Sequence, residues 1–199
     1  MRKIEILRNL KKLLGIYDGD KEAQDAIELL LKKAELFQED RSHKAGAEES
    51  FALPEQLREL SSGFAIFADG ACRGNPGPGA WATLIQDTKA EIILKSSGVD
   101  VPTTNNKMEL EGVIRGLKGL VEKWIEEGFS DHESPVFIFS DSKYVIDGIE
   151  KWVPGWKSRG WKKADQKAPE NLVLWQELDE LKERFNHITF LWVKGHAGQ

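Results

Sequence analysis

The chain has 199 residues, and 28 Lys and Arg against 33 Asp and Glu give it a net charge of −5. Its 40% hydrophobic and 31% charged residues are typical of a soluble globular protein and exclude a disordered one. No apolar run approaches the roughly 20 residues of a membrane-spanning helix, and the single cysteine excludes an internal disulfide framework and a Cys-rich zinc site. We expect a cytoplasmic protein with no membrane partner, whose net acidity argues mildly against nucleic acid.

The N-terminal region has a helical pattern. Residues 3–14 repeat apolar side chains at the helical period, and a second apolar stripe runs from Ala23 to Phe37. We expect a small helical hairpin over residues 1–40 and a linker over residues 41–63, with a short helix at Pro54–Leu60. The apolar face of the hairpin favours packing or self-association, and a substrate-handling accessory module is the alternative.

After Gly63 the period changes to that of strands. In chain order, we expect strands over residues 64–69, 81–86 and 91–96, a helix from Thr104 or Asn105 to about residue 127, a strand over 136–140, helices over about 142–152 and 169–185, and a strand over 188–193. Residues 72–79 are expected to be irregular because of their Pro and Gly content. The order βββ-α-β-α-α-β predicts an α/β fold with one mixed sheet and helices packed on it.

Three acids stand at informative points in this pattern. Asp69 and Asp141 each follow an apolar strand run, and Glu109 lies about one turn inside the helix that begins near Thr104. If the two strands are neighbours, the acids share one crevice at the edge of the sheet. Converging carboxylates favour a hard divalent cation such as Mg²⁺ or Mn²⁺. Taken singly, each acid also suits a turn, a helix cap or a favourable position on the helix dipole.

A basic, Trp-rich stretch covers residues 151–167. Six basic residues against one acid give it a local charge of +5, with Trp152, Trp156 and Trp161 interleaved. Basic side chains neutralise phosphates, and indole faces pack against sugars and bases. The stretch therefore favours a nucleic-acid contact, and the alternative is a solvated basic face above buried Trp side chains. Cys72 is expected to be a small packing residue, since no His lies near it in sequence.

Four segments resemble the signature segments of type 1 ribonuclease H, in that family's order and spacing: Asp69–Gly79, Thr103–Leu110, Ser140–Val145 and Lys194–Gly198. The stretch Trp152–Lys163 resembles the basic protrusion of the family. The resemblance covers residues 64–199 and implies a ribonuclease H domain with a mixed five-stranded sheet. It implies an endoribonuclease that hydrolyses the RNA strand of RNA–DNA hybrids and leaves 5′-phosphate and 3′-hydroxyl ends.

By this resemblance, Asp69, Glu109 and Asp141 occupy the metal-binding positions for two Mg²⁺ ions, with Mn²⁺ as a substitute. His196 occupies the position of a catalytic histidine that assists water activation or product release.

The resemblance also implies a set of substrate-binding positions. These are the readers of the 2′-hydroxyls and the minor groove (Cys72, Asn75, Asn105 and Asn106), the DNA phosphate pocket (Thr104 and Asn171), the channel for the DNA strand (Tyr144, Trp152 and Trp156) and the basic protrusion (Lys157, Trp161 and Lys162).

Two features depart from the family pattern. The family carries a fourth acid on a terminal helix about ten residues past the His196 position, whereas this chain ends three residues after His196, at Gln199. We therefore expect a domain without the usual C-terminal helix, and the alternative function is a hybrid-binding module with weak or no cleavage. The extension up to Gly63, with 11 basic and 13 acidic residues, does not resemble a basic hybrid-binding domain.

Overall fold

The computed structural model describes residues 53–126 and 133–194. The chain divides into two units, Met1–Phe51 and Ala52–Gln199, and the second contains all the described residues. The hairpin expected over residues 1–40, its self-association and His196 lie outside the described residues. Among the described helices, none has the length and apolar character needed to cross a membrane.

Five strands form one mixed sheet, as the sequence predicts, and their order in the sheet is β3-β2-β1-β4-β5. The strands are β1 (Phe64–Cys72), β2 (Gly77–Asp87), β3 (Ile92–Thr103), β4 (Val136–Ser140) and β5 (Ile188–Trp192). The pairs β1–β2 and β2–β3 are antiparallel, whereas β4 runs parallel to both β1 and β5. The first and fourth strands are therefore neighbours, which is the arrangement that the acidic crevice requires.

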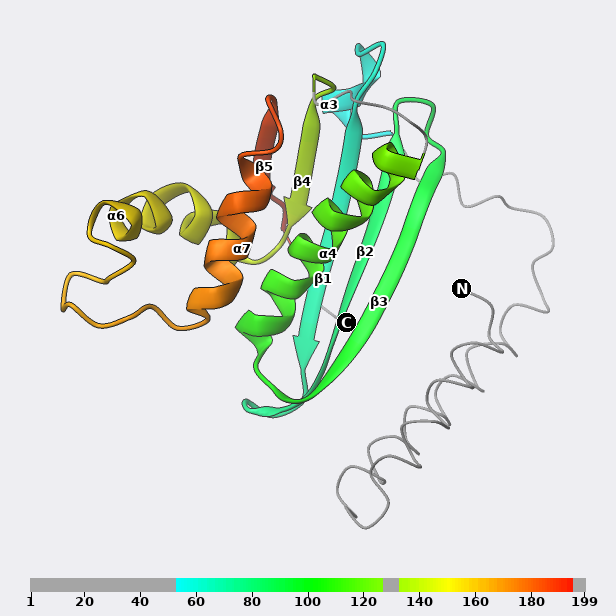
Figure 1. Cartoon of the computed structure of the whole chain (residues 1–199). Coiled ribbons are helices and arrows are strands. Elements are labelled where there is room, and N and C mark those ends of the chain that lie inside the picture. Colours follow the sequence, from blue (N-terminus) through cyan, green and yellow to red (C-terminus); the bar gives the residue numbers. More distant parts are fainter. Residues whose placement is uncertain (1–52, 127–132, 195–199) are drawn as a thin grey trace, which may run out of the picture. The chain divides into compact units, whose positions relative to one another are not determined.

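The helices are α3 (Glu55–Arg58), α4 (Asn105–Glu126), α5 (Lys143–Asp147), the π-helix η2 (Gly148–Trp152), α6 (Val153–Ser158) and α7 (Leu172–Lys182). Figure 1 shows α4 lying across the sheet over β1 and β2, with α7 beside it. The buried face of α4 and the buried Trp175 and Leu178 of α7 form the main core with Ile66 and Ile138. Leu57 of α3 packs with Ala65 and Phe139 in a second, smaller cluster. Ala65 and Phe139 are next to Ile66 and Ile138 in sequence, so their side chains point to the opposite face of the sheet.

Several boundaries differ from the prediction, because strand pairing overrides local preference. The segment expected to be irregular gives Cys72 to β1 and Gly77 to β2, where they pair with Gly79 and Thr103 respectively. The strand expected to end at residue 96 continues to Thr103 as β3.

The two helices expected after the fourth strand also have other bounds. The first continues as α5, η2 and α6 to Ser158, because the wider π turn at 148–152 keeps the backbone helical and Pro154 lies in the first turn of α6. The second begins at Leu172 rather than Pro169, because Asn171 has a left-handed backbone with φ 55°.

Candidate active site

Asp69 and Asp141 come from the two neighbouring parallel strands. The register pairs Phe67 with Phe139, so the two acids lie two residues beyond the last pair, at matching heights. The expectation that Asp69 ends its strand is wrong, because β1 continues to Cys72 and pairs Asp69 with Ala82 of β2. β4 has already ended at this height, which leaves both acids exposed. The short partner strand thus opens the site beside Asp69.

A close approach of α4 to β1 carries Glu109 to the same place. A Cβ atom on Gly70 would lie 2.3 Å from the backbone nitrogen of Glu109, and one on Gly112 would lie 3.0 Å from the carbonyl oxygen of Asp69. Side chains at either position would push the helix off the strand. The two glycines therefore let the elements that carry Asp69 and Glu109 touch through their backbones.

The Glu109 carboxylate is half-buried and hydrogen-bonded at both oxygens. The Asn105 amide donates to Oε1 at 2.7 Å, and the Ser142 hydroxyl donates to Oε2. Burial raises the pKa of Glu109, and the charges of Asp141 and Asp69 raise it further, whereas the two hydrogen bonds lower it. The charges of Asp69 and Asp141 therefore reach Glu109, which puts the three acids in one neighbourhood.

This donor set fits a hard divalent cation. The donors are carboxylate oxygens, which such ions prefer, and a cation would offset the repulsion that the Asp69 and Asp141 charges exert on Glu109. Within residues 53–126 and 133–194, no three His, Cys, Asp or Glu side chains are already gathered into a metal-binding group. The fit to a cation therefore rests on the chemistry of the three carboxylates and not on an assembled group of ligands.

Two residues beside Asp141 were missed by the sequence analysis. The Trp192 indole donates a hydrogen bond to the backbone oxygen of Asp141 at 3.0 Å, and the Lys143 ammonium lies 5.0 Å from the centre of the Trp192 ring. Lys143 follows Asp141 closely in the chain, but Trp192 is about fifty residues away, and only the pairing of β4 with β5 brings it near. These contacts fix the backbone of Asp141 from the side of β5.

The residues expected to read the RNA strand surround the N-terminus of α4. The Cys72 thiol donates to the carbonyl oxygens of Thr103 and Gly77 at 3.3 and 3.5 Å, and the backbone N–H of Asn105 donates to Asn75 Oδ1 at 3.4 Å. These contacts bring the β1–β2 loop to the start of the helix that holds Glu109.

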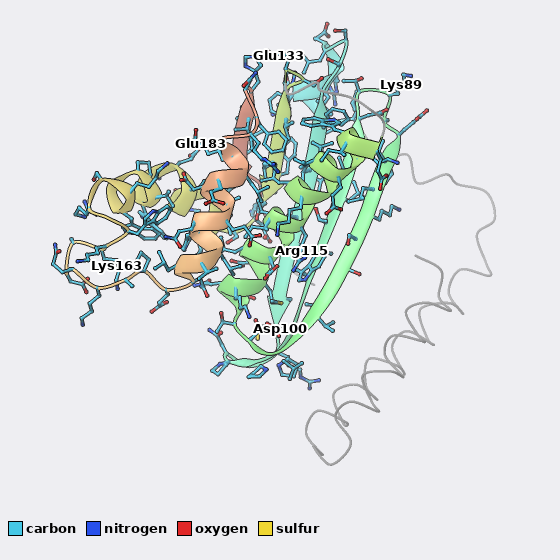
Figure 2. The ribbon with its side chains drawn as sticks, viewed as in Figure 1. Lys89, Asp100, Arg115, Glu133, Lys163 and Glu183 are labelled. Atoms are coloured by element: carbon cyan, nitrogen blue, oxygen red, sulfur yellow. The ribbon has the colours of Figure 1, made fainter. Side chains whose placement is uncertain are left out.

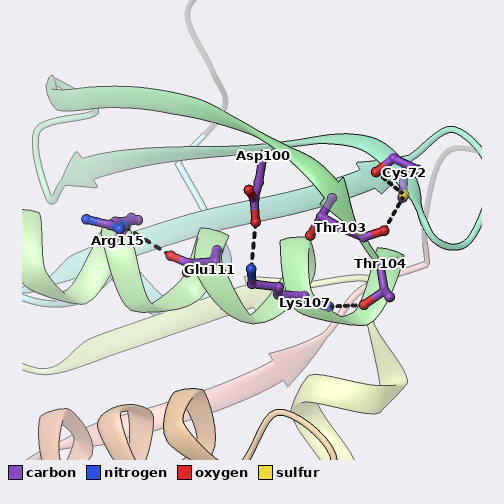
Figure 3. A network of polar contacts seen from close by, with 8 residues as sticks. Cys72, Asp100, Thr103, Thr104, Lys107, Glu111 and Arg115 are labelled. Carbon is purple, nitrogen blue, oxygen red and sulfur yellow. Dashed lines mark hydrogen bonds and ion pairs between the residues drawn. The ribbon is translucent and has the colours of Figure 1, made fainter. Parts of the chain in front are cut away.

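Of the two residues proposed to cap α4, Thr104 accepts the N–H of Lys107 at 3.3 Å. Figure 3 shows this cap beside the Lys107–Asp100 ion pair, in which the charged atoms lie 2.6 Å apart. Asn106 follows in the first turn of α4 and is half-buried. Asn171, the other residue expected in the phosphate pocket, donates to the Tyr144 hydroxyl at 3.2 Å. Thr104 and Asn171 thus have separate partners, and their joint pocket stays a prediction.

The aromatic residues expected in the DNA channel form one cluster. The ring of Tyr144 lies 5.8 Å from that of Trp152 and 5.2 Å from that of Trp175, and Trp156 lies 6.0 and 5.7 Å from those two indoles. Trp152 is 39% exposed, whereas Trp156 and Trp161 are partly buried against the core. The alternative reading, with Trp side chains beneath a basic face, thus holds in part for Trp156 and Trp161.

The basic side chains of the protrusion differ in their partners. Lys157 Nζ lies 2.7 Å from Asp179 and 3.7 Å from Glu183, both on or just after α7, and the hydrogen bond to Asp179 is the main cause that raises the pKa of Lys157. Lys162 has no ion pair among the described residues. Figure 2 shows Lys163 in the loop after α6 and Glu183 beyond α7. Lys157, which was expected to contact the substrate, instead forms ion pairs with acidic side chains of the protein.

Comparisons with known proteins find similar sequences and structures for this domain. The sequence model of the family described as RNase H matches residues 61–199. Proteins named Ribonuclease H are 48% identical over 133 residues in Erythrobacter litoralis, covering 67% of this chain and 83% of that protein, and 46% identical over 141 residues in Mesorhizobium japonicum, covering 70% and 71%.

Two solved structures are also similar. LC9-RNase H1, a type 1 RNase H with the type 2 active-site motif, has a TM-score of 0.56 and 32% identity over 70% of this chain and 66% of that one. LC11-RNase H1, solved in complex with an RNA/DNA hybrid, has a TM-score of 0.50 and 27% identity over 65% of this chain and 84% of that one.

Proposed function

The chain belongs to the ribonuclease H family, and from this membership we infer that it is an endoribonuclease that hydrolyses the RNA strand of RNA–DNA hybrids. The observation that carries this inference is the acidic site, in which the charges of Asp69 and Asp141 act on Glu109. Hybrid binding without cleavage is not favoured, because the curated relatives are named as the enzyme.

Divalent metal ions are general in this family, and we propose Mg²⁺ here, two ions per site, with Mn²⁺ as a substitute. Asp69, Glu109 and Asp141 would hold the metal, which when bound supplies activation of a water nucleophile and stabilisation of the leaving 3′-oxygen. The water oxygen bonds to phosphorus and loses a proton, the bond to the 3′-oxygen breaks, and that oxygen gains a proton, so the products carry a 5′-phosphate and a 3′-hydroxyl. His196, beyond the described residues, stays a proposal as the group that assists this step.

The chain's own residues supply binding and orientation. The exposed Asp69 and Asp141 flank the opening where β4 ends, so a phosphodiester can reach them. Asn75 and Asn105 lie beside this opening, where they can meet 2′-hydroxyl groups, the feature that distinguishes RNA from DNA. The basic loop after α6 offers Lys162 to a phosphate of the DNA strand.

Exchange of Asp69 for asparagine tests the function. Asp69→Asn keeps the size of the side chain and removes one negative oxygen donor, so we expect Mg²⁺-dependent cleavage of the RNA strand to fall by at least about 10³-fold, on the scale of a lost electrostatic catalytic group. Gel analysis of a labelled hybrid measures cleavage, and fluorescence anisotropy in EDTA measures hybrid affinity, which we expect to change little.

The matched control is Glu122→Gln, which removes the same charge at an exposed position on α4 outside the site. We expect this control to cleave at the rate of the unmodified chain. Cleavage retained by Asp69→Asn would refute the assignment of the acidic site, and absence of cleavage by the unmodified chain with Mg²⁺ or Mn²⁺ would refute the proposed function.

The cytoplasmic location expected from the cysteine content stays a proposal, as does self-association through the hairpin. Both rest on sequence patterns alone, and the residues of the hairpin lie outside the described part of the chain.

A further inference from the structure

The Ser142 hydroxyl joins the two elements that bring Asp141 and Glu109 to the site. Ser142 follows Asp141 directly, caps α5 and is 5% exposed. Its oxygen accepts the backbone N–H of Val145 at 3.2 Å while its proton is donated to Glu109 Oε2 on α4. A single hydroxyl therefore ties the strand–helix turn that carries one acid to the helix that carries the other.

The backbone of this turn is itself held in place. The Ser142 N–H donates to the Ser140 hydroxyl at 3.1 Å, and the Val193 N–H donates to the Ser140 carbonyl at 3.0 Å. Ser140 is 2% exposed at the end of β4. The Ser142 hydroxyl is thus a fixed donor and not a freely rotating surface group.

Asn105 holds the other oxygen of the same carboxylate. Its amide donates to Glu109 Oε1 at 2.7 Å from one turn earlier on α4, and its backbone N–H donates to Asn75. With one donor on each oxygen, the carboxylate plane is set, while the remaining lone pairs stay available for a cation. Both bonds favour the ionised form, against the effects of burial and of the neighbouring acids.

We propose that Ser142 and Asn105 are positioning residues that hold Glu109 in the orientation in which it binds metal, together with Asp141. This inference deepens the proposed function and rests on it. It also gives Asn105 a role on the enzyme's own carboxylate, beside the 2′-hydroxyl contact proposed above. Groups that orient a metal ligand typically change metal affinity by about 10–100-fold.

The test is direct metal binding without nucleic acid. Isothermal titration of the full chain with MnCl₂ should show affinity weakened by about tenfold or more in Ser142→Ala and in Ser142→Gly. Glycine is a better helix cap than alanine, so these two variants differ in thermal stability while both lack the donor. Ser142→Thr keeps the hydroxyl, and we expect it to restore the affinity.

Asn105→Ala separates the two roles of Asn105. If Asn105 positions Glu109, Asn105→Ala weakens Mn²⁺ binding in the free protein. If Asn105 only contacts 2′-hydroxyls, the substitution weakens only hybrid binding, measured in EDTA. Unchanged Mn²⁺ affinity in Ser142→Ala and Ser142→Gly would overturn the proposal. A loss of Mn²⁺ affinity that is larger in the less stable of these two variants, or that Ser142→Thr does not restore, would overturn it as well.

These outcomes are distinguishable from failure of the proposed function. A chain that binds Mn²⁺ but leaves hybrids uncut would contradict the proposed function, while the Ser142 variants would still decide the positioning role. Absence of Mn²⁺ binding by the unmodified chain would overturn the positioning proposal directly.

Discussion

At the scale of single residues, Glu109 meets opposing demands. Its proposed role in metal binding requires a charged carboxylate, yet burial and the charges of Asp141 and Asp69 raise the pKa of Glu109 and so disfavour the charge. Hydrogen bonds from Ser142 and Asn105 offset part of this cost. The site therefore stores unfavourable electrostatic energy that a bound cation would relieve.

Removal of this charge should stabilise the metal-free protein. In the unfolded chain Glu109 titrates near its ordinary pKa of 4.5, below its pKa in the folded state. As the pH rises through this window, the unfolded chain loses its proton first, so stability falls, and the full cost is present above the folded pKa. We expect Glu109→Gln to raise the melting temperature by a few degrees at about pH 7 in EDTA.

The same substitution should give little or no rise below the ordinary glutamate pKa, where the carboxyl is protonated in both states. Thermal unfolding followed by circular dichroism across this pH range measures the effect. A melting temperature that is unchanged near neutral pH, or raised equally at all pH values, would show that the charge of Glu109 carries no such cost.

At the scale of elements, the protrusion is fastened to the domain through α7. Lys157 on α6 reaches Asp179, which is 7% exposed, and the Trp156 indole packs on Trp175 of the same helix. Loss of the cation would leave the nearly buried Asp179 carboxylate as an uncompensated charge, which is destabilising. The loop after α6 thus starts from a helix that is fastened to the core. Lys157 on α6 holds the structure, whereas Lys162 in the loop faces solvent.

Two lysines of this protrusion should therefore respond differently to loss of charge. We expect Lys157→Gln to lower the melting temperature, because it removes the cation that pairs with the nearly buried Asp179. We expect Lys162→Gln to leave stability unchanged and to weaken hybrid binding, with the salt-dependence slope reduced by about 1.

Thermal unfolding and hybrid affinity at several salt concentrations measure these two effects, and each variant serves as the control for the other. An equal loss of salt dependence in both variants would contradict the division, since it would mean that Lys157 releases Asp179 to bind a phosphate.

At the scale of the whole domain, the site exists because elements far apart in sequence meet at one place. β1, α4 and the turn after β4 each supply one acid, and the space between them opens because β4 stops at Ser140 while β1 continues. The separation of β1 from α4 is set by Gly70, whose missing side chain leaves room for the backbone of Met108 and Glu109. Packing of the sheet and helix therefore fixes the spacing of the acids.

Gly70→Ala tests this dependence. The added Cβ would lie 2.3 Å from backbone nitrogen, a contact that no side-chain movement can relieve, so α4 must shift away from β1. We expect a loss of about 1–3 kcal/mol in stability, as for other overpacked cores, and a fall in cleavage rate at saturating hybrid.

The control for this variant is Gly155→Ala in α6, where the added atom meets only the flexible end of Arg159 at 3.3 Å. We expect this change to leave stability equal or slightly higher, because alanine favours a helix. Chemical denaturation and single-turnover cleavage measure both variants, and a fully stable, fully active Gly70→Ala would disprove the role of this contact.

Local patterns in the sequence determined the elements and the chemistry of the acids. Apolar periodicity predicted the α4 helix and the apolar β4 strand closely, since both bury a continuous face. The positions of Asp69, Glu109 and Asp141 indicated the carboxylates proposed to bind metal. Tertiary structure decided what depends on pairing across long separations. It extended β1 beyond Asp69, brought the Ser142 hydroxyl to Glu109, and committed Lys157 to Asp179. Such contacts follow from the packing of whole elements against one another, which the local pattern of a sequence does not contain.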